Sequence, residues 1–129
     1  MASLFDKFMK KQNTKNSDHS STSTIEYLNE PPSDSQEVSI EVRIFGRVQG
    51  VGFRYTTKQL ADELGVVGRV RNENDGSVYV QGSAKKNIID KFITELSNSP
   101  SPSGRVEHLE VKYIKEQDIK DKDDFRITN

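Results

Sequence analysis

A strand-like alternation that runs into a glycine-rich segment and then a helical repeat most constrains how this chain can fold. Apolar residues occupy every second position from Val38 to Ile44, which is the period of a half-buried β-strand. Glycines follow at positions 46, 50 and 52, and an apolar helical face over 53–64 ends at Gly65, a typical C-terminal cap. The folded part of the chain therefore begins with a strand, a loop and a helix.

Later segments extend this order. The patterns predict strands over 66–71 and 78–80 around an Asn74-Asp75-Gly76 turn, a helix over 88–96, and strands over 106–113 and 125–127. We therefore predict an α+β, ferredoxin-like split βαβ sandwich, in which two helices cover one face of an antiparallel sheet. Because the first βαβ crossover makes its two strands parallel, the glycine-rich loop and Asn72 are expected at the same edge of the sheet.

Residues 1–36 differ in composition from residues 37–129, which we interpret as a single domain. The leader contains no glycine, is rich in small polar residues and Lys, and includes Pro31-Pro32. Its few apolar residues cannot offset the entropy of ordering the backbone, so we predict that most of it is disordered. Residues 3–11 are a candidate for a short amphipathic helix that could dock on a membrane or a partner, although so short a helix is marginal alone.

Charge and cysteine content exclude several classes of protein. The net charge is −1, which argues against a generic nucleic-acid binder. The chain has no cysteine, which excludes disulfides and thiolate metal sites. No apolar run is long enough to span a bilayer. Asp6 and Lys7 interrupt the apolar residues at the start, so we do not expect a signal peptide there. We expect a cytoplasmic monomer without nucleic-acid partners or stable membrane insertion.

The glycine-rich loop predicts an anion-binding cradle. Its glycines allow successive backbone N–H groups to turn toward one point, and the following helix N-terminus adds unpaired donors. Arg54 falls in the first helical turn, where a cation is unfavourable unless an anion is bound, and its planar guanidinium can hold two phosphate oxygens. The expected cradle consists of Gln49, Gly50, Val51, Gly52, Phe53 and Arg54.

Each motif alone also has a simpler interpretation. The glycines could serve packing in a tight turn beside a solvated Arg54. Asn72 could be a turn residue, because Asn is common next to hairpins. The loop and Asn72 alone leave these alternatives open.

Two segments resemble the two sequence signatures of the acylphosphatases. Residues 44–54, IFGRVQGVGFR, are similar to the first signature, and residues 68–78, GRVRNENDGSV, are similar to the second. The likeness extends from about residue 38 to residue 127. The resemblance implies a ferredoxin-like fold, hydrolysis of carboxyl–phosphate anhydrides, and catalytic positions for Arg54 and Asn72. The chain departs from the family pattern at Arg69, where a bulky apolar residue is usual, and at Ala84, where glycine is common.

The implied reaction suits these residues. An acyl phosphate expels a carboxylate, whose conjugate acid has a pKa near 4, so no general acid is required. The cradle and Arg54 can hold the phosphate, while Asn72 orients the attacking water. We therefore predict an acylphosphatase that needs no cofactor or metal and acts on small acyl phosphates such as acetyl or carbamoyl phosphate. We assign His19 and His108 to the solvated surface.

Two other functions remain open at this stage. A non-catalytic anion-binding or regulatory module of the same fold would keep the cradle. Single-stranded RNA could bind the open sheet face, although Tyr79 is the only aromatic residue that the third strand offers for stacking.

Overall fold

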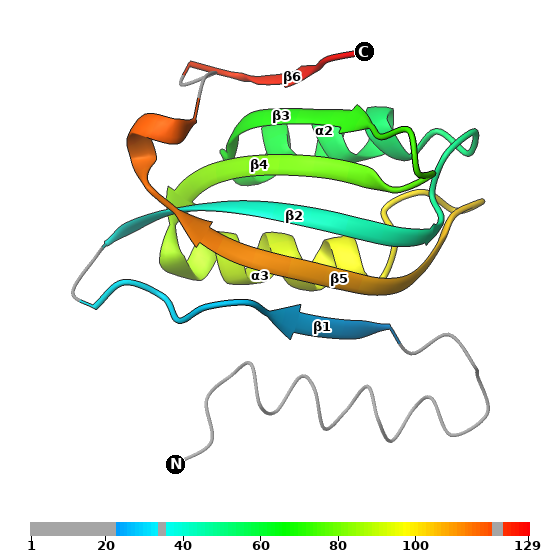
Figure 1. Cartoon of the computed structure of the whole chain (residues 1–129). Coiled ribbons are helices and arrows are strands. Elements are labelled where there is room, and N and C mark those ends of the chain that lie inside the picture. The colour runs from blue at the N-terminus through cyan, green and yellow to red at the C-terminus, as the bar shows by residue number, and fades with distance from the viewer. Residues whose placement is uncertain (1–22, 34–35, 120–122) are drawn as a thin grey trace.

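A six-stranded mixed sheet covered by two helices on one face forms the protein (Figure 1). The computed structural model describes residues 23–33, 36–119 and 123–129. The strand order is β1-β5-β2-β4-β3-β6. The strands are β1 (Thr24–Tyr27), β2 (Glu37–Arg47), β3 (Val67–Asn72), β4 (Val78–Lys85), β5 (Arg105–Ile114) and β6 (Phe125–Ile127), and the helices are α2 (Phe53–Leu64), α3 (Lys86–Ser97) and the short 3-10 helix η2 (Glu116–Asp118). The ferredoxin-like α+β sandwich is confirmed.

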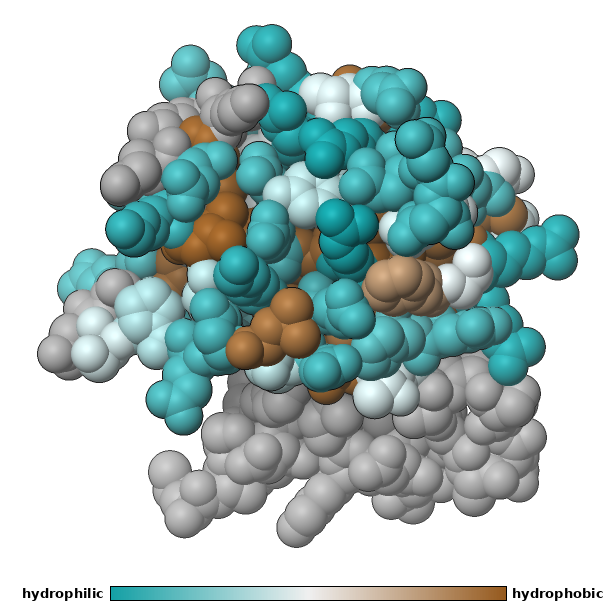
Figure 2. All heavy atoms as spheres, in the orientation of Figure 1, coloured by the Kyte–Doolittle hydropathy of each residue, from teal (hydrophilic) through white to brown (hydrophobic). Residues whose placement is uncertain are grey.

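The core lies between the sheet and the two helices. Alternate residues of β2, including Ile40, Val42 and Ile44, are fully buried, as their period predicts. Phe53 and Ala61 of α2 and Phe92 of α3 close the core from the other side. The opposite face of the sheet is mostly hydrophilic, with separate apolar patches (Figure 2). No helix in the described ranges is long and apolar enough to cross a membrane.

The four central strands of the sheet pair antiparallel to one another, whereas each of the two outer strands pairs in parallel with its neighbour. Strand β1 pairs with β5 in parallel, and β6 pairs with β3 in parallel. The expectation of an antiparallel sheet is therefore wrong at the two edges. Strands β2 and β3 both run antiparallel to β4, so they end on the same side, as the crossover predicts.

Strand β1 corrects the prediction for the leader, because Thr24–Tyr27 is part of the sheet. Ile25 packs against the core, and the ring of Tyr27 stacks on Tyr113 with a centroid distance of 6.3 Å. The side chain of Asn29 donates to the carbonyl of Tyr113 at 3.0 Å and accepts from its N–H at 2.8 Å. Composition missed this strand because its backbone is ordered by the unpaired edge of β5. The candidate helix near residues 3–11 lies outside the described residues.

We predict that Asn29→Ala lowers the free energy of unfolding by about 1 kcal/mol, because both backbone groups of Tyr113 lose their partner. Chemical denaturation of this variant and of Glu30→Ala, an exposed neighbour, measures the effect. Equal stability of the two variants would show that Asn29 does not hold β1 in place.

Candidate active site

Two glycines of the loop between β2 and α2 are required by backbone conformation. Gly50 and Gly52 have φ angles of 75° and 80°, and no atom lies within 4 Å of where a Cβ would be. Gly46 and Gly68 are different, because a Cβ there would lie 2.3 Å from the carbonyl oxygen of Arg105 and 2.0 Å from that of Gln81, respectively. Close backbone packing therefore explains Gly46 and Gly68, whereas Gly50 and Gly52 allow the backbone conformation of the loop.

The loop leaves its backbone donors open. Helix α2 begins after Gly52 without a side-chain cap or an acidic residue in its first turn. The carbonyl of Gly52 accepts from the N–H of Thr56 at 3.1 Å and from its hydroxyl at 3.0 Å. Within the described part of the chain, no backbone N–H of residues 49–54 has a hydrogen-bond acceptor. Unpaired donors at a helix N-terminus form a site for an anion.

The loop is held in place from two sides. Nε2 of Gln49 donates to the carbonyl oxygens of Glu73 at 2.8 Å and Ser77 at 2.9 Å, which tie it to the β3–β4 hairpin. The hydroxyl of Ser101, beyond α3, donates to the carbonyl of Val51. The tether to the hairpin confirms that the glycine-rich loop and the end of β3 share one edge of the sheet.

Arg54 lies in the first turn of α2 and reaches the last residue of the sequence. Its Nη1 donates to the backbone oxygen of Asn129 at 2.7 Å. The N–H of Thr128 donates to the carbonyl of Val70 at 2.8 Å, which extends the pairing of β6 with β3 to the residue before Asn129. The structure gives the Arg54 guanidinium no other partner among the described residues. Most of its donors are therefore available for an anion.

Asn72 ends β3 and presents an unpaired acceptor. Its Oδ1 is buried and has no hydrogen-bond partner among the described residues. A buried polar atom without a partner is costly, so this oxygen is a natural position for a water or a ligand donor. Asn72 and Asn129 line the same hollow of about 630 Å³. Arg54 is not one of the lining residues, but it contacts Asn129, which is.

Three arginines line the same hollow, namely Arg43, Arg69 and Arg71. Arg43 and Arg71 pair with Glu73 at 3.4 and 2.9 Å, which offsets part of their charge. Arg69, the departure from the family pattern, adds a third arginine to the lining of this hollow. The second departure, Ala84, is accommodated in the core, where it is 9% exposed.

Tyr79 lies on the open sheet face between two of these arginines. The guanidinium carbons of Arg71 and Arg43 lie 4.5 and 5.7 Å from its ring centroid. Its hydroxyl donates to Glu41 at 2.6 Å, and burial together with this bond raises the pKa of Tyr79 to about 12. The ring is therefore occupied by contacts within the protein, and stacking a base on it would require their displacement.

With this geometry established, comparison with known proteins identifies the family. The acylphosphatase family model matches residues 40–127. The chain belongs to the acylphosphatase family. It is an enzyme that hydrolyses acyl phosphates, and the catalytic interpretation of the two signatures is therefore favoured over a non-catalytic anion-binding module.

Individual acylphosphatase sequences and solved structures are also similar to this chain. The chain is 51% identical over 73 residues to an acylphosphatase of Enterococcus faecalis, covering 57% of this chain and 80% of the relative. It is 44% identical over 91 residues to that of Lactiplantibacillus plantarum, covering 70% and 98%. The acylphosphatase structure from Bacillus subtilis is 29% identical with a TM-score of 0.66, covering 71% of this chain and 99% of that one.

Sequence reasoning located the acylphosphatase loop but not what holds it. The sequence pattern predicted a role only for the backbone N–H of Gln49, whereas its side chain ties the loop to the hairpin. Ser101 and Asn129 lie far from the loop in sequence, and no local pattern marks them.

We predict that Gln49→Glu lowers kcat/KM by roughly 10–100-fold, because a carboxylate would face two carbonyl acceptors that lose their donor. Steady-state hydrolysis of acetyl phosphate measures the loss. Gln59→Glu, an exposed change on α2, is the control and is expected to be neutral. Unchanged kinetics of Gln49→Glu would show that the tether does not shape the loop.

Proposed function

We propose that the backbone N–H groups of residues 49–54 and the guanidinium of Arg54 hold the phosphate, while Asn72 orients the attacking water. The observation that carries this proposal is the uncapped N-terminus of α2, whose open donors adjoin an arginine in the same turn. Anions are favoured at such a position, and an arginine there is favoured only when an anion is present.

The reaction requires little beyond positioning and charge stabilisation. A water oxygen forms a bond to phosphorus as the bond from phosphorus to the acyl oxygen breaks. One proton of the water passes to a phosphoryl oxygen or to solvent, and the products are a carboxylate and inorganic phosphate. The departing carboxylate is a weak base and needs no proton, so no general acid is needed. The transition state is loose and spreads charge over the phosphoryl oxygens, which fixed donors stabilise.

Asn72 fits the remaining task. Its unpaired Oδ1 can accept a hydrogen bond from a water and thereby fix the direction of attack. An amide cannot act as a strong base, and an already activated acyl phosphate does not require one. The substrates we propose are therefore small acyl phosphates such as acetyl or carbamoyl phosphate.

The active form that we propose is a monomer. The loop, Gln49, Arg54 and Asn72 all come from one chain, and their hydrogen bonds close within it. A second protomer is not needed to complete the site.

We predict that Arg54→Lys loses nearly as much kcat/KM as Arg54→Ala, because an ammonium cannot hold two phosphate oxygens in one plane. Phosphate should inhibit the wild type competitively and both variants far more weakly. Steady-state kinetics with acetyl phosphate and added phosphate measures both effects. Lys58→Ala, on the same helix, is the matched control. Retention of most activity in Arg54→Ala would place the anion site elsewhere.

Asn72→Ala is expected to separate chemistry from binding. If Asn72 only orients water, kcat should fall by about 10²–10³ while inhibition by phosphate stays close to wild type. The unfolding midpoint should also remain close to wild type, because the β3–β4 turn is unchanged. Weakened phosphate inhibition with preserved kcat would instead make Asn72 part of the cradle.

A further inference from the structure

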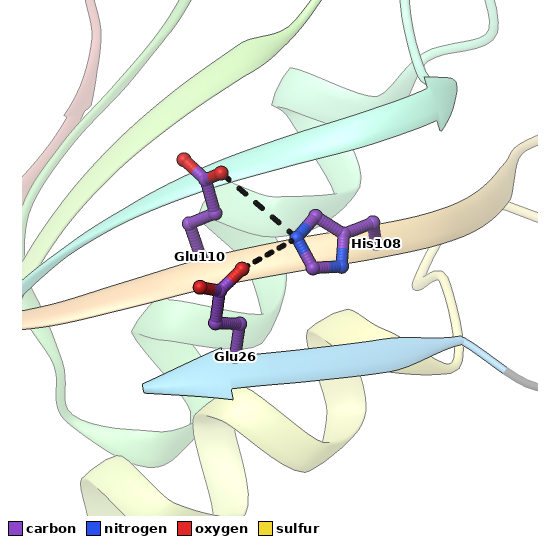
Figure 3. Close-up of side chains that lie close together, drawn as sticks. All are labelled: Glu26, His108 and Glu110. Atoms are coloured by element: carbon purple, nitrogen blue, oxygen red, sulfur yellow. Dashed lines mark ion pairs between the residues drawn. The ribbon is translucent and has the colours of Figure 1, made fainter. Parts of the chain in front are cut away.

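Glu26, His108 and Glu110 bring an imidazole and two carboxylates together outside the active site (Figure 3). Glu26 belongs to β1, whereas His108 and Glu110 belong to β5. The neighbouring Leu109 and Val111 are fully buried, so the cluster lies on the sheet face away from the helices. One donor atom from each side chain lies within 4.8 Å of the others.

The distances in this cluster suit a shared ion better than direct hydrogen bonds. Nε2 of His108 lies 3.3 Å from Oε1 of Glu26 and 3.9 Å from Oε2 of Glu110. Common N–H···O distances are about 2.7–3.2 Å. Ligand atoms around a tetrahedral Zn²⁺ with bonds of about 2.0–2.2 Å are roughly 3.3–3.6 Å apart. Small side-chain rotations would bring all three donors onto one ion.

Electrostatics also favours a cation at this position. Glu26 lies directly opposite Glu110 in the register of β1 and β5, and like charges at opposed positions are destabilising. Arg43 faces Glu110 from β2, but its guanidinium pairs with Glu73 at 3.4 Å. A divalent ion between the two carboxylates would turn their repulsion into attraction.

His108 is held in a suitable orientation. Its ring stacks on Phe45 of β2 with a centroid distance of 6.0 Å and an interplanar angle of 29°. Nε2 points toward both carboxylates (Figure 3). The side chains of the cluster are between one third and just over one half exposed, so an ion can enter from solvent.

We propose that Glu26, His108 and Glu110 bind a divalent transition-metal ion of the Zn²⁺ type, which fastens β1 to β5. One imidazole nitrogen and two carboxylate oxygens suit Zn²⁺, whereas Mg²⁺ and Ca²⁺ prefer oxygen-only sites with more ligands. A water would complete the tetrahedron. Glu26 lies outside the region that the family model matches, residues 40–127, whereas His108 and Glu110 lie inside it, so the complete cluster depends on β1.

Calorimetric titration of Zn²⁺ into the full chain, freed of metal by chelation, tests this proposal. We expect about one equivalent of Zn²⁺ to bind at the cluster. Loss of a residue that only supports a metal ligand typically weakens binding by roughly 10–100-fold, so loss of a ligand itself in Glu26→Gln, His108→Asn or Glu110→Gln should weaken it at least as much. Glu107→Gln, on the same strand, is the matched control and should bind as wild type does. Mg²⁺ should not compete. Hydrolysis of acetyl phosphate should be unaffected by chelator and retained in every variant, which verifies their folding.

Hydrogen exchange on the unmodified chain provides a second test. The N–H of Leu28 donates to the carbonyl of Val111 at 2.8 Å, so fastening β1 should slow its exchange when Zn²⁺ is added. The absence of Zn²⁺ binding, or equal affinity in wild type and all three variants, would overturn the site. Zn²⁺ binding without protection of Leu28 would overturn the fastening of β1.

Discussion

In the active site that we propose, the unpaired backbone donors at the N-terminus of α2 are the constraint on which the other features depend. A helix start without a cap, with Gly52 before it and no acidic side chain in its first turn, leaves N–H groups that only water or an anion can satisfy. The fold keeps this arrangement rigid through two hydrogen bonds. The side chain of Gln49 donates to the carbonyl of Glu73 in the hairpin, and the hydroxyl of Ser101 donates to the carbonyl of Val51 in the loop. In the proposed mechanism, these rigidly held donors stabilise the charge that develops on the phosphoryl group.

Local sequence patterns predicted the central fold because they report local physics. The alternation in β2, the capping glycine of α2 and the Asn74-Asp75-Gly76 turn each determine one element without long-range information. Strand β1 was missed because its order depends on pairing with β5, far away in sequence. The parallel edges were missed for the same reason.

The candidate site was predictable to the same extent. The loop and the edge shared with Asn72 follow from glycine positions and the handedness of the crossover. Side-chain partners such as Gln49 with Glu73, or Arg54 with Asn129, depend on register and side-chain packing, which no short motif encodes. The approach of Glu26 to His108 has the same origin, because it depends on how β1 aligns with β5.

Titration of the isotope-labelled chain with inorganic phosphate, followed by amide chemical shifts, tests the central claim most directly. If the open donors of α2 form the cradle, the largest shifts will occur at the backbone amides of residues 49–54, with a dissociation constant equal to the inhibition constant of phosphate. Shifts centred instead on Arg43, Arg69 and Arg71, with residues 49–54 unchanged, would contradict the account. Phosphate would then bind in the arginine-lined hollow rather than at the helix N-terminus.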